Sequence, residues 1–199
     1  MITLSTSDPK KSAYHHGDLR EALIGAALTI LCEGGDPGAL SLREAARRAG
    51  VSAMAPYRHF DDKDALLAAV ATRGFERLAA AQAEASARVD PLDAVIGQGV
   101  AYVSFACDEP ALFRLMFGEA AVARSGDLGE VAARSYHALE DAVAKITAPK
   151  QAEVAALQCW ALAHGLASLA VTGQLKRYGT PPSILAERVL RAAYSDEER

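Results

Sequence analysis

The chain lacks the cysteine pattern of a disulfide-stapled or zinc-binding protein. Its three cysteines, Cys32, Cys107 and Cys159, are odd in number and widely spaced, which fits neither a disulfide framework nor a metal knuckle. We expect them to be small buried hydrophobic residues in a reducing cytosol. The sequence also has no metal-ligand spacing, glycine-rich phosphate loop or local nucleophile motif. These absences predict no metal, no cofactor and no enzymatic activity, although a catalytic site assembled only in space stays open as an alternative.

Long apolar segments are scarce as well. The first 20 residues hold no continuous apolar stretch of the kind found in export signals, which predicts a cytoplasmic protein. One segment, residues 154–175, carries no Asp, Glu, Lys or Arg and has about the length needed to cross a bilayer. Because it is rich in alanine and contains Gln158, His164 and Thr172, a membrane span is the less favoured interpretation. We expect instead a helix buried inside protein.

No segment shows the alternating pattern of a strand, which predicts an all-α fold. Asp18 is placed to cap a first helix over 19–33, and Ser41 opens a second helix with Glu44 in capping-box register. Ser52 is expected to begin a third. Proline and glycine bound the remaining predicted helices, which cover 63–89, 91–107, 110–118, 127–147, 150–175 and 181–194. We place a domain boundary after residue 62, giving domains 1–62 and 63–199 with no flexible linker between them.

Positive charge is concentrated at the amino-terminal end of an acidic chain. The net charge is −4, yet residues 1–60 contain seven Lys or Arg against six Asp or Glu, and the remainder contains 14 against 19. Three of the five histidines also lie in the first 60 residues. A chain of this net charge is not expected to coat nucleic acid, but its first part can face an anionic partner.

Residues 41–60 have the pattern of a helix-turn-helix. SLREAARRA is followed by the turn GVS and then by AMAPYRHF, and small residues such as Ala45 and Ala46 allow two helices to cross closely. Gly50 supplies the backbone freedom that the turn needs. An ordinary helical hairpin is the alternative. The cationic and aromatic side chains favour a surface for DNA, and they are Arg43, Arg47, Arg48, Tyr57, Arg58 and His59.

The stretch SLREAARRAGVSAMAPYRHFDDKDALL resembles the DNA-binding signature of the TetR family of transcriptional regulators, and YHHGDLREALIGAA is similar to the first helix of one branch of that family. The resemblance covers residues 14–67. It implies a three-helix amino-terminal helix-turn-helix domain, a carboxy-terminal helical ligand-binding and dimerisation domain, and a homodimer on palindromic or pseudo-palindromic double-stranded operator DNA. It also implies a repressor that a small, largely apolar effector releases from its operator. Five residues match positions that hold DNA phosphates in the family, namely Ser41, Ser52, Tyr57, His59 and Lys63.

Other residues of the first domain are expected to contribute to DNA binding. Ala53, Met54 and Ala55 offer no side-chain hydrogen bonds, so direct recognition by this helix should rest on contact with thymine methyl groups. Further sequence preference would come from Arg43, from DNA shape, and from the arm that holds Tyr14 and His15. Tyr57 could equally be a packing residue. An architectural DNA-binding protein without an effector is the second alternative function.

The second domain contains candidates for an effector pocket and a dimer interface. Aromatic and apolar residues at helical spacing predict an apolar pocket with a polar anchor, although core packing would explain most of them. They are Tyr102, Phe105, Phe113, Met116, Phe117, Trp160 and His164. The pairing of Trp160, His164 and Gly165 with PALFRLMFG resembles the effector domain of one TetR branch. A stripe of small residues and the apolar face of the last helix predict a four-helix dimer interface, with packing within one subunit as the alternative. The interface residues are Ala161, Gly165, Ser168, Thr172, Ile184, Leu185, Arg188 and Val189.

Overall fold

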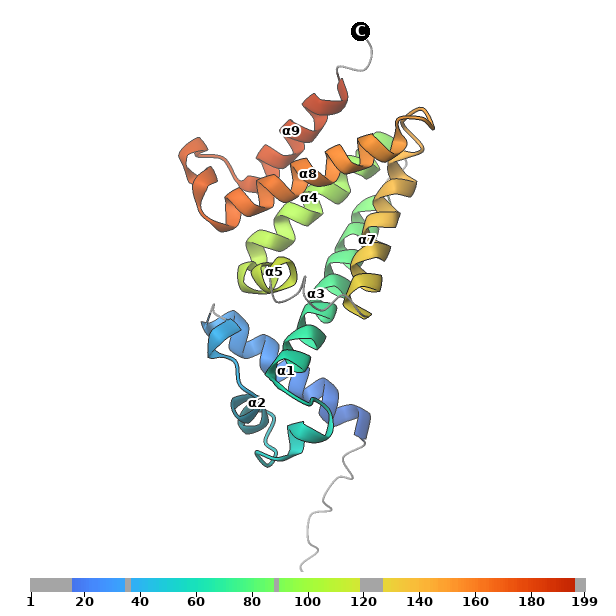
Figure 1. Cartoon of the computed structure of the whole chain (residues 1–199). Helices are drawn as coiled ribbons and strands as arrows, with labels where there is room; N and C mark the ends of the chain where they lie inside the picture. Colours follow the sequence, from blue (N-terminus) through green and yellow to red (C-terminus); the bar gives the residue numbers. More distant parts are fainter. Residues whose placement is uncertain (1–15, 35–36, 88–89, 119–126, 196–199) are drawn as a thin grey trace, which may run out of the picture.

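Helices stacked in two groups make up the computed structural model of the chain (Figure 1). The structure describes residues 16–34, 37–87, 90–118 and 127–195. Within these ranges it contains eight α-helices, three short 3₁₀ turns and no strand, which confirms the predicted all-α fold.

The amino-terminal group begins with α1 (His16–Gly34), η1 (Pro37–Ala39) and α2 (Leu42–Arg48). Helix α1 starts two residues before Asp18, so Asp18 lies in its first turn and is not the cap that we predicted. Ser41 does cap α2, because its Oγ accepts a hydrogen bond from the backbone N–H of Glu44 at 3.1 Å. The Glu44 carboxylate binds Arg47 and Arg48 instead of reaching back to the cap. Of the two hydrogen bonds of the predicted capping box, the one accepted by the Ser41 side chain forms, and the Glu44 carboxylate is bound to the arginines instead.

Helix α3 (Lys63–Ser86) joins the two groups and runs from one into the other (Figure 1). It begins after Asp62, whose Oδ1 accepts a hydrogen bond from the backbone N–H of Ala65 at 2.7 Å. Apolar residues three or four positions apart form the stripe that it buries, and they include Leu66, Val70 and Leu78. Because α3 starts at the predicted domain boundary without a linker, the two groups share one rigid element. The division into 1–62 and 63–199 stays a prediction.

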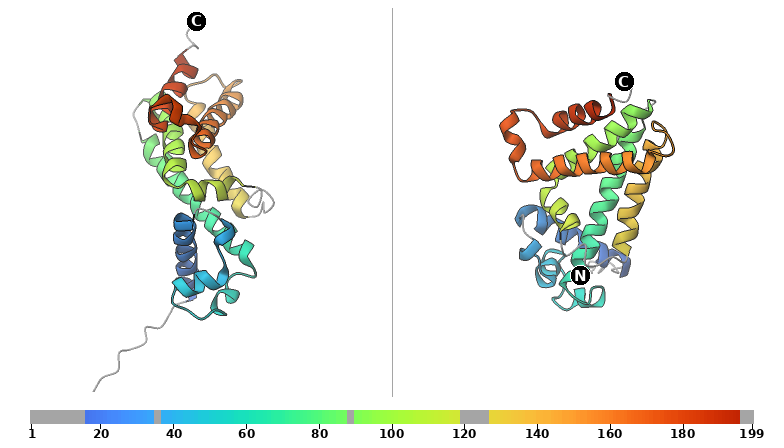
Figure 2. Two further views of the ribbon diagram at one scale, coloured as in Figure 1. Left: turned by 90° about the vertical axis from the view of Figure 1, so that its left-hand side faces the viewer. Right: turned by 45° about the horizontal axis from the view of Figure 1, so that its top comes forward.

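The carboxy-terminal group contains the remaining helices, whose bounds lie within a few residues of the predicted ones. They are α4 (Pro91–Asp108), α5 (Pro110–Phe117), α7 (Asp127–Val143), α8 (Ala152–Val171) and α9 (Pro182–Ser195). The 3₁₀ turn η3 (Gln174–Tyr178) between α8 and α9 was not predicted. Helix α4 is central, because α3, α8 and α9 all pack against it. Helix α7 lies beside α3, and α8 and α9 cover one side of the group (Figure 2).

One hydrophobic core crosses between the two groups. It includes Leu23 and Phe60 of the amino-terminal group together with Phe75, Tyr102 and Phe113. A second buried cluster joins α4, α7, α8 and α9 around Val95, Leu139, Cys159 and Leu190. The orientation of the amino-terminal group is thus fixed by apolar packing as well as by α3.

Polar contacts add to this junction. Arg73 of α3 forms an ion pair with Glu21 of α1 at 2.5 Å, and Arg77 of α3 pairs with Glu109, which lies between α4 and α5. The Cys32 thiol near the end of α1 lies 3.8 Å from the same Glu109 carboxylate. Glu109 between α4 and α5 thus contacts both α1 and α3.

Two expectations about burial were wrong in part. Cys159 is buried as predicted, but Cys32 and Cys107 are exposed. Helix α8 is long and apolar enough to cross a membrane by length and composition, yet it packs on α4, α7 and α9, and only 28% of its most apolar window is buried within the structure. We had expected α8 to be hidden inside protein, and its outer face remains open.

Candidate functional site

The amino-terminal group contains a helix, a tight turn and a second short element. Gly50 follows α2 with a φ of 70°, a conformation that costs glycine little and other residues considerably more. The Val51 N–H donates back to the Ala46 carbonyl at 3.0 Å, which closes the turn. Ala45 and Ala46 are fully buried where α2 packs against its neighbours, and their small side chains allow the backbones to approach closely.

The element after the turn is shorter than we predicted. We expected a helix from Ser52, but only Ala55–Arg58 form a regular element, the 3₁₀ turn η2. Pro56 explains the difference, because it has no N–H to donate to the Ser52 carbonyl as an α-helix would require. The Ala55 N–H bonds that carbonyl instead at 2.9 Å, in the three-residue spacing of a 3₁₀ turn. Pro56 itself is buried, so it anchors the turn.

Most predicted DNA-contacting residues lie on the open surface of this motif. Met54, at the tip, is 70% exposed, and Tyr57 is 44% exposed. Tyr14 and His15 lie outside the described residues. The other exposed members of the set are Ser41, Arg43, Ser52, Ala53 and Arg58, while Ala55, His59 and Lys63 are partly exposed. The described members of the set lie in the segment that runs from the start of α2 to the start of α3.

The charge of this surface is smaller than the sequence suggests. Glu44 bonds both Arg47, at 2.7 Å, and Arg48, at 3.1 Å, and these hydrogen bonds, that of Arg47 first, lower the pKa of Glu44 to about 2. Arg48 also pairs with Glu33 at 2.5 Å. Neither arginine is therefore a free cation. Sequence inspection missed this neutralisation, although Glu44 lies three and four residues before its partners, the spacing at which helical ion pairs form.

Within residues 41–63, three other cations can face an anionic partner. Arg43 and Arg58 form no ion pair with the described residues. The Lys63 ammonium donates a hydrogen bond to the Gly38 carbonyl at 2.9 Å. Lys63 is also the first residue of α3, and the N-terminal end of a helix favours a bound anion such as phosphate. These groups are suited to phosphate oxygens.

The carboxy-terminal group contains a cluster of aromatic rings around His164. The Tyr102 hydroxyl and His164 Nδ1 are 2.8 Å apart, and the Phe117 and Trp160 ring centroids lie 4.9 Å and 5.7 Å from that of the imidazole. Burial lowers the pKa of His164 and raises that of Tyr102. Both groups are therefore neutral at pH 7, and their hydrogen bond fixes the ring orientations.

An apolar cavity of about 330 Å³ lies beside this cluster, between α3, α4, α7 and α8. Tyr102, Phe117 and Trp160, three of the residues that we selected from the sequence, line it. His164 lies behind them and lines a shallower pocket with Phe113. We call the first of these the aromatic cavity, and its volume falls in the range of roughly 300–1,000 Å³ that is typical of small-molecule sites.

Two residues that we selected for the pocket do not line the aromatic cavity, and two that we did not select do line it. Phe105 and Met116 are buried in the hydrophobic core instead of lining it. Phe75 of α3 and Tyr136 of α7 do line it, and sequence inspection did not select them. An aromatic residue in the long helix was the available signal for Phe75. Tyr136 lies on α7, which becomes a cavity wall only when it packs against α3.

Helices α8 and α9 present an open face to solvent. Leu157 is 51% exposed, and Val154, Leu169 and Ile184 are exposed as well. The predicted interface residues divide between open and partly covered positions. Ala161, Thr172, Ile184 and Arg188 are exposed, and Gly165, Ser168, Leu185 and Val189 are partly exposed. Exposed apolar side chains on two packed helices are typical of a protein interaction surface.

A helix, a tight turn and a short second element carry exposed cations and are joined through α3 to a helical domain with an apolar cavity, an arrangement that indicates a DNA-binding regulator. Residues 23–70 match the family model for bacterial regulatory proteins of the tetR family, and residues 95–193 match that for the tetracyclin repressor-like C-terminal domain. The chain belongs to the TetR family of DNA-binding transcriptional regulators. Members of this family are transcription factors and not enzymes, which confirms the prediction of no enzymatic activity.

Individual proteins give a consistent result. The chain is 34% identical over 101 residues to an uncharacterised HTH-type transcriptional regulator of Haemophilus influenzae, a match that covers 50% of this chain and 49% of that protein. A solved structure of a Rhodococcus protein of unknown function is 34% identical, with a TM-score of 0.80, and the match covers 93% of this chain and 98% of that one. The TetR family regulator PfmR of Thermus thermophilus matches at 19% identity with a TM-score of 0.59 over 88% and 93% of the two chains. At that identity, PfmR supports the fold alone.

Proposed function

We propose that the protein is a homodimeric transcriptional repressor of the cytoplasm, which a small, largely apolar effector releases from a palindromic or pseudo-palindromic operator. We call residues 41–63 the DNA-facing motif. The observation that carries the proposal is the continuous packing that runs from the aromatic cavity through α3 to this motif. In this division of labour residues 1–62 bind DNA, and residues 63–199 bind the effector and the second subunit.

The DNA-facing motif supports recognition of DNA through contacts with its phosphate backbone and apolar contacts with its bases. Ser41, Ser52, Tyr57, His59 and Lys63 are the proposed phosphate contacts, because hydroxyl, imidazole and ammonium groups at helix starts suit phosphate oxygens. Ala53, Met54 and Ala55 form an apolar tip that carries no hydrogen-bonding side chain. The tip would contact thymine methyl groups in the major groove. Arg43, exposed near the start of α2, is the proposed contact to base edges.

The open face of α8 and α9 supports dimerisation. Val154, Leu157 and Ile184 expose apolar surface there, and a twofold axis would bury the same patch from both subunits. A four-helix interface of this kind holds two DNA-facing motifs at a fixed separation, which must be about 34–36 Å to match one helical turn of DNA.

The aromatic cavity supports effector control. Its wall includes Phe75, which is part of α3, and Phe117, which belongs to α5 and lies 5.2 Å from the Phe75 ring between centroids. Helix α5 also packs against α1. A ligand that displaces these rings would therefore act on α3 and α1 together and change the separation of the two motifs.

Selection of bound fragments from random duplex DNA tests the DNA-binding half of the proposal. We expect two symmetric half-sites one helical turn apart. Binding at increasing salt should give a slope of log affinity against log salt of about −5 to −7, which corresponds to about three or four phosphates neutralised by charged side chains per subunit. Recovery of no consensus, or a flat salt response, would refute this half.

A thermal-shift screen against small apolar compounds tests the effector half. A compound at 100 times its dissociation constant adds about 2.7 kcal/mol to the free energy of unfolding, and it should release the selected duplex. A protein that binds the duplex with little sequence preference and is stabilised by no compound would instead be an architectural DNA-binding protein.

A further inference from the structure

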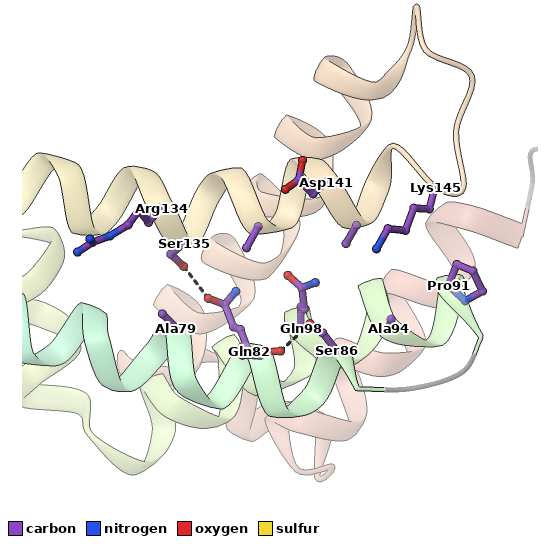
Figure 3. Close-up of a pocket in the computed structure, with 13 residues that line it drawn as sticks. Ala79, Gln82, Ser86, Pro91, Ala94, Gln98, Arg134, Ser135, Asp141 and Lys145 are labelled. Carbon is purple, nitrogen blue, oxygen red and sulfur yellow. Dashed lines mark hydrogen bonds between the residues drawn. The ribbon is translucent and has the colours of Figure 1, made fainter.

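A second cavity, of about 610 Å³, lies between α3, α4 and α7 (Figure 3). We call it the amide cavity. It adjoins the aromatic cavity, because Gln82 of α3 and Ser135 of α7 line both. The Ser135 hydroxyl donates to Gln82 Oε1 at 2.7 Å, and this hydrogen bond stands where the two cavities meet.

Two glutamine side chains give the amide cavity its character. Gln82 and Gln98 are 8% and 3% exposed and are the buried polar side chains of the part of the chain that the structure describes. In Figure 3 both extend from α3 and α4 toward α7. Gln98 Oε1 is buried and has no hydrogen-bond partner among the described residues. Native proteins rarely leave such a group unpaired, because its desolvation is then uncompensated.

The charged residues of the amide cavity are confined to its rim. Arg134, Asp141 and Lys145 line it but are exposed to solvent. Among the described residues that line it, the interior therefore offers neutral amides and hydroxyls and no buried cation. A carboxylate placed beside Gln98 would lose its hydration without gaining a counter-charge, which is costly. A neutral group that both donates and accepts hydrogen bonds would satisfy Gln98 Oε1 and the amide nitrogen of Gln82.

We propose that the effector is a neutral amphipathic molecule whose carboxamide or hydroxyl head binds Gln98 and Gln82 in the amide cavity and whose apolar tail occupies the aromatic cavity. This inference rests on the proposed function, since it names the chemical class of the effector. The head would connect α4 to α3 through Gln98 Oε1 and the amide nitrogen of Gln82, while Ser135 of α7 donates to Gln82 Oε1. Binding of the effector would therefore link the three helices that form the cavity through one set of hydrogen bonds.

The single tryptophan provides a direct measurement. Trp160 lines the aromatic cavity, so its fluorescence should change when an alkyl tail enters. Octanamide and octanoate are matched probes that share the tail length and differ in the head. We expect the full-length protein at pH 7.5 to bind octanamide at least tenfold more tightly than octanoate.

A pair of variants assigns the preference to the amide cavity. Gln98→Leu should weaken octanamide binding about tenfold and reduce the difference between the two probes to about twofold. Gln151→Leu makes the same change at an exposed residue whose side chain forms no capping hydrogen bond, and it should retain the wild-type preference. Circular dichroism melting of both variants checks that they fold.

Three outcomes would overturn the inference. They are octanoate binding as tightly as octanamide, binding of neither probe, and an unchanged octanamide affinity in a folded Gln98→Leu variant, which would mean that water satisfies the Gln98 oxygen. Duplex binding is measured separately, with the fragment selected from random DNA. A protein that binds its duplex and fails these tests retains the proposed function and loses only this effector class.

Discussion

Replacing Leu157 with alanine should weaken homodimerisation about thirtyfold. Leu157 is 51% exposed on the outer face of α8, and complete burial of a leucine side chain stabilises by about 1.5–3 kcal/mol. Burying the exposed half at an interface therefore contributes about 1 kcal/mol. A twofold interface contains this contact twice, so the variant loses about 2 kcal/mol, and each 1.4 kcal/mol changes the dissociation constant tenfold.

Analytical ultracentrifugation over a dilution series measures the dimer dissociation constant directly. The matched control is Met54→Ala, which shortens a side chain that is 70% exposed and lies between α2 and η2 in the amino-terminal group, whereas α8 belongs to the carboxy-terminal group. It should leave the dimer constant unchanged and weaken duplex binding at every protein concentration. Leu157→Ala should weaken duplex binding only below its own dimer constant. A folded Leu157→Ala variant that dimerises within about twofold of the wild type would refute the proposed interface.

Three further predictions concern the turn, the buried imidazole and the DNA contacts. Gly50→Ala should lower the free energy of unfolding by about 1 kcal/mol in urea titrations, because φ at this residue is 70°. Its control, Gly25→Ala, lies in an open position within α1 and should raise the free energy of unfolding by a comparable amount. Equal effects of the two substitutions would contradict the turn geometry. His164 has a lowered pKa because of burial, so the unfolded chain takes up its proton first as the pH falls, and the stability due to the neutral ring is lost below the unfolded pKa of about 6.5. The melting temperature of the wild type should then fall more steeply between pH 7.5 and 5 than that of His164→Gln, and parallel curves would count against this reasoning. Lys63→Ala should weaken binding to all duplexes alike, whereas Arg43→Ala should also relax base preference in the selected sequences; the same loss of preference from both would mean that their roles were assigned wrongly.

Much of the fold could be predicted because its local signals are strong. Prolines at 91, 110 and 182 stand at the first position of α4, α5 and α9, where a missing N–H costs nothing. Ser41 and Asp62 cap the helices that follow them. Signals of this kind lie within a few residues of the boundary that they set, so a single sequence contains them.

The remaining features depend on partners distant in the chain or on competition between local effects. The motif after Ser52 resembled a helix by its pattern, and the one missing N–H of Pro56 shortened it to a 3₁₀ turn. The aromatic cavity takes one wall from Tyr136, whose role depends on how α7 lies against α3. The buried Gln98 could not be recognised in the sequence, because its position on the inner face of α4 gives no sign that its amide lacks a partner.

The length of α3 has a mechanical consequence. Its 24 residues form a rod of about 36 Å at a rise of 1.5 Å per residue. Phe75 and Lys63 are 12 residues apart on this rod, which is about 18 Å along the helix axis. A rotation of α3 by about 10° around the level of Phe75 would therefore carry Lys63 through about 3 Å, close to the length of a hydrogen bond, so a small change of angle beside the aromatic cavity would become a displacement at the end of α3 that faces DNA.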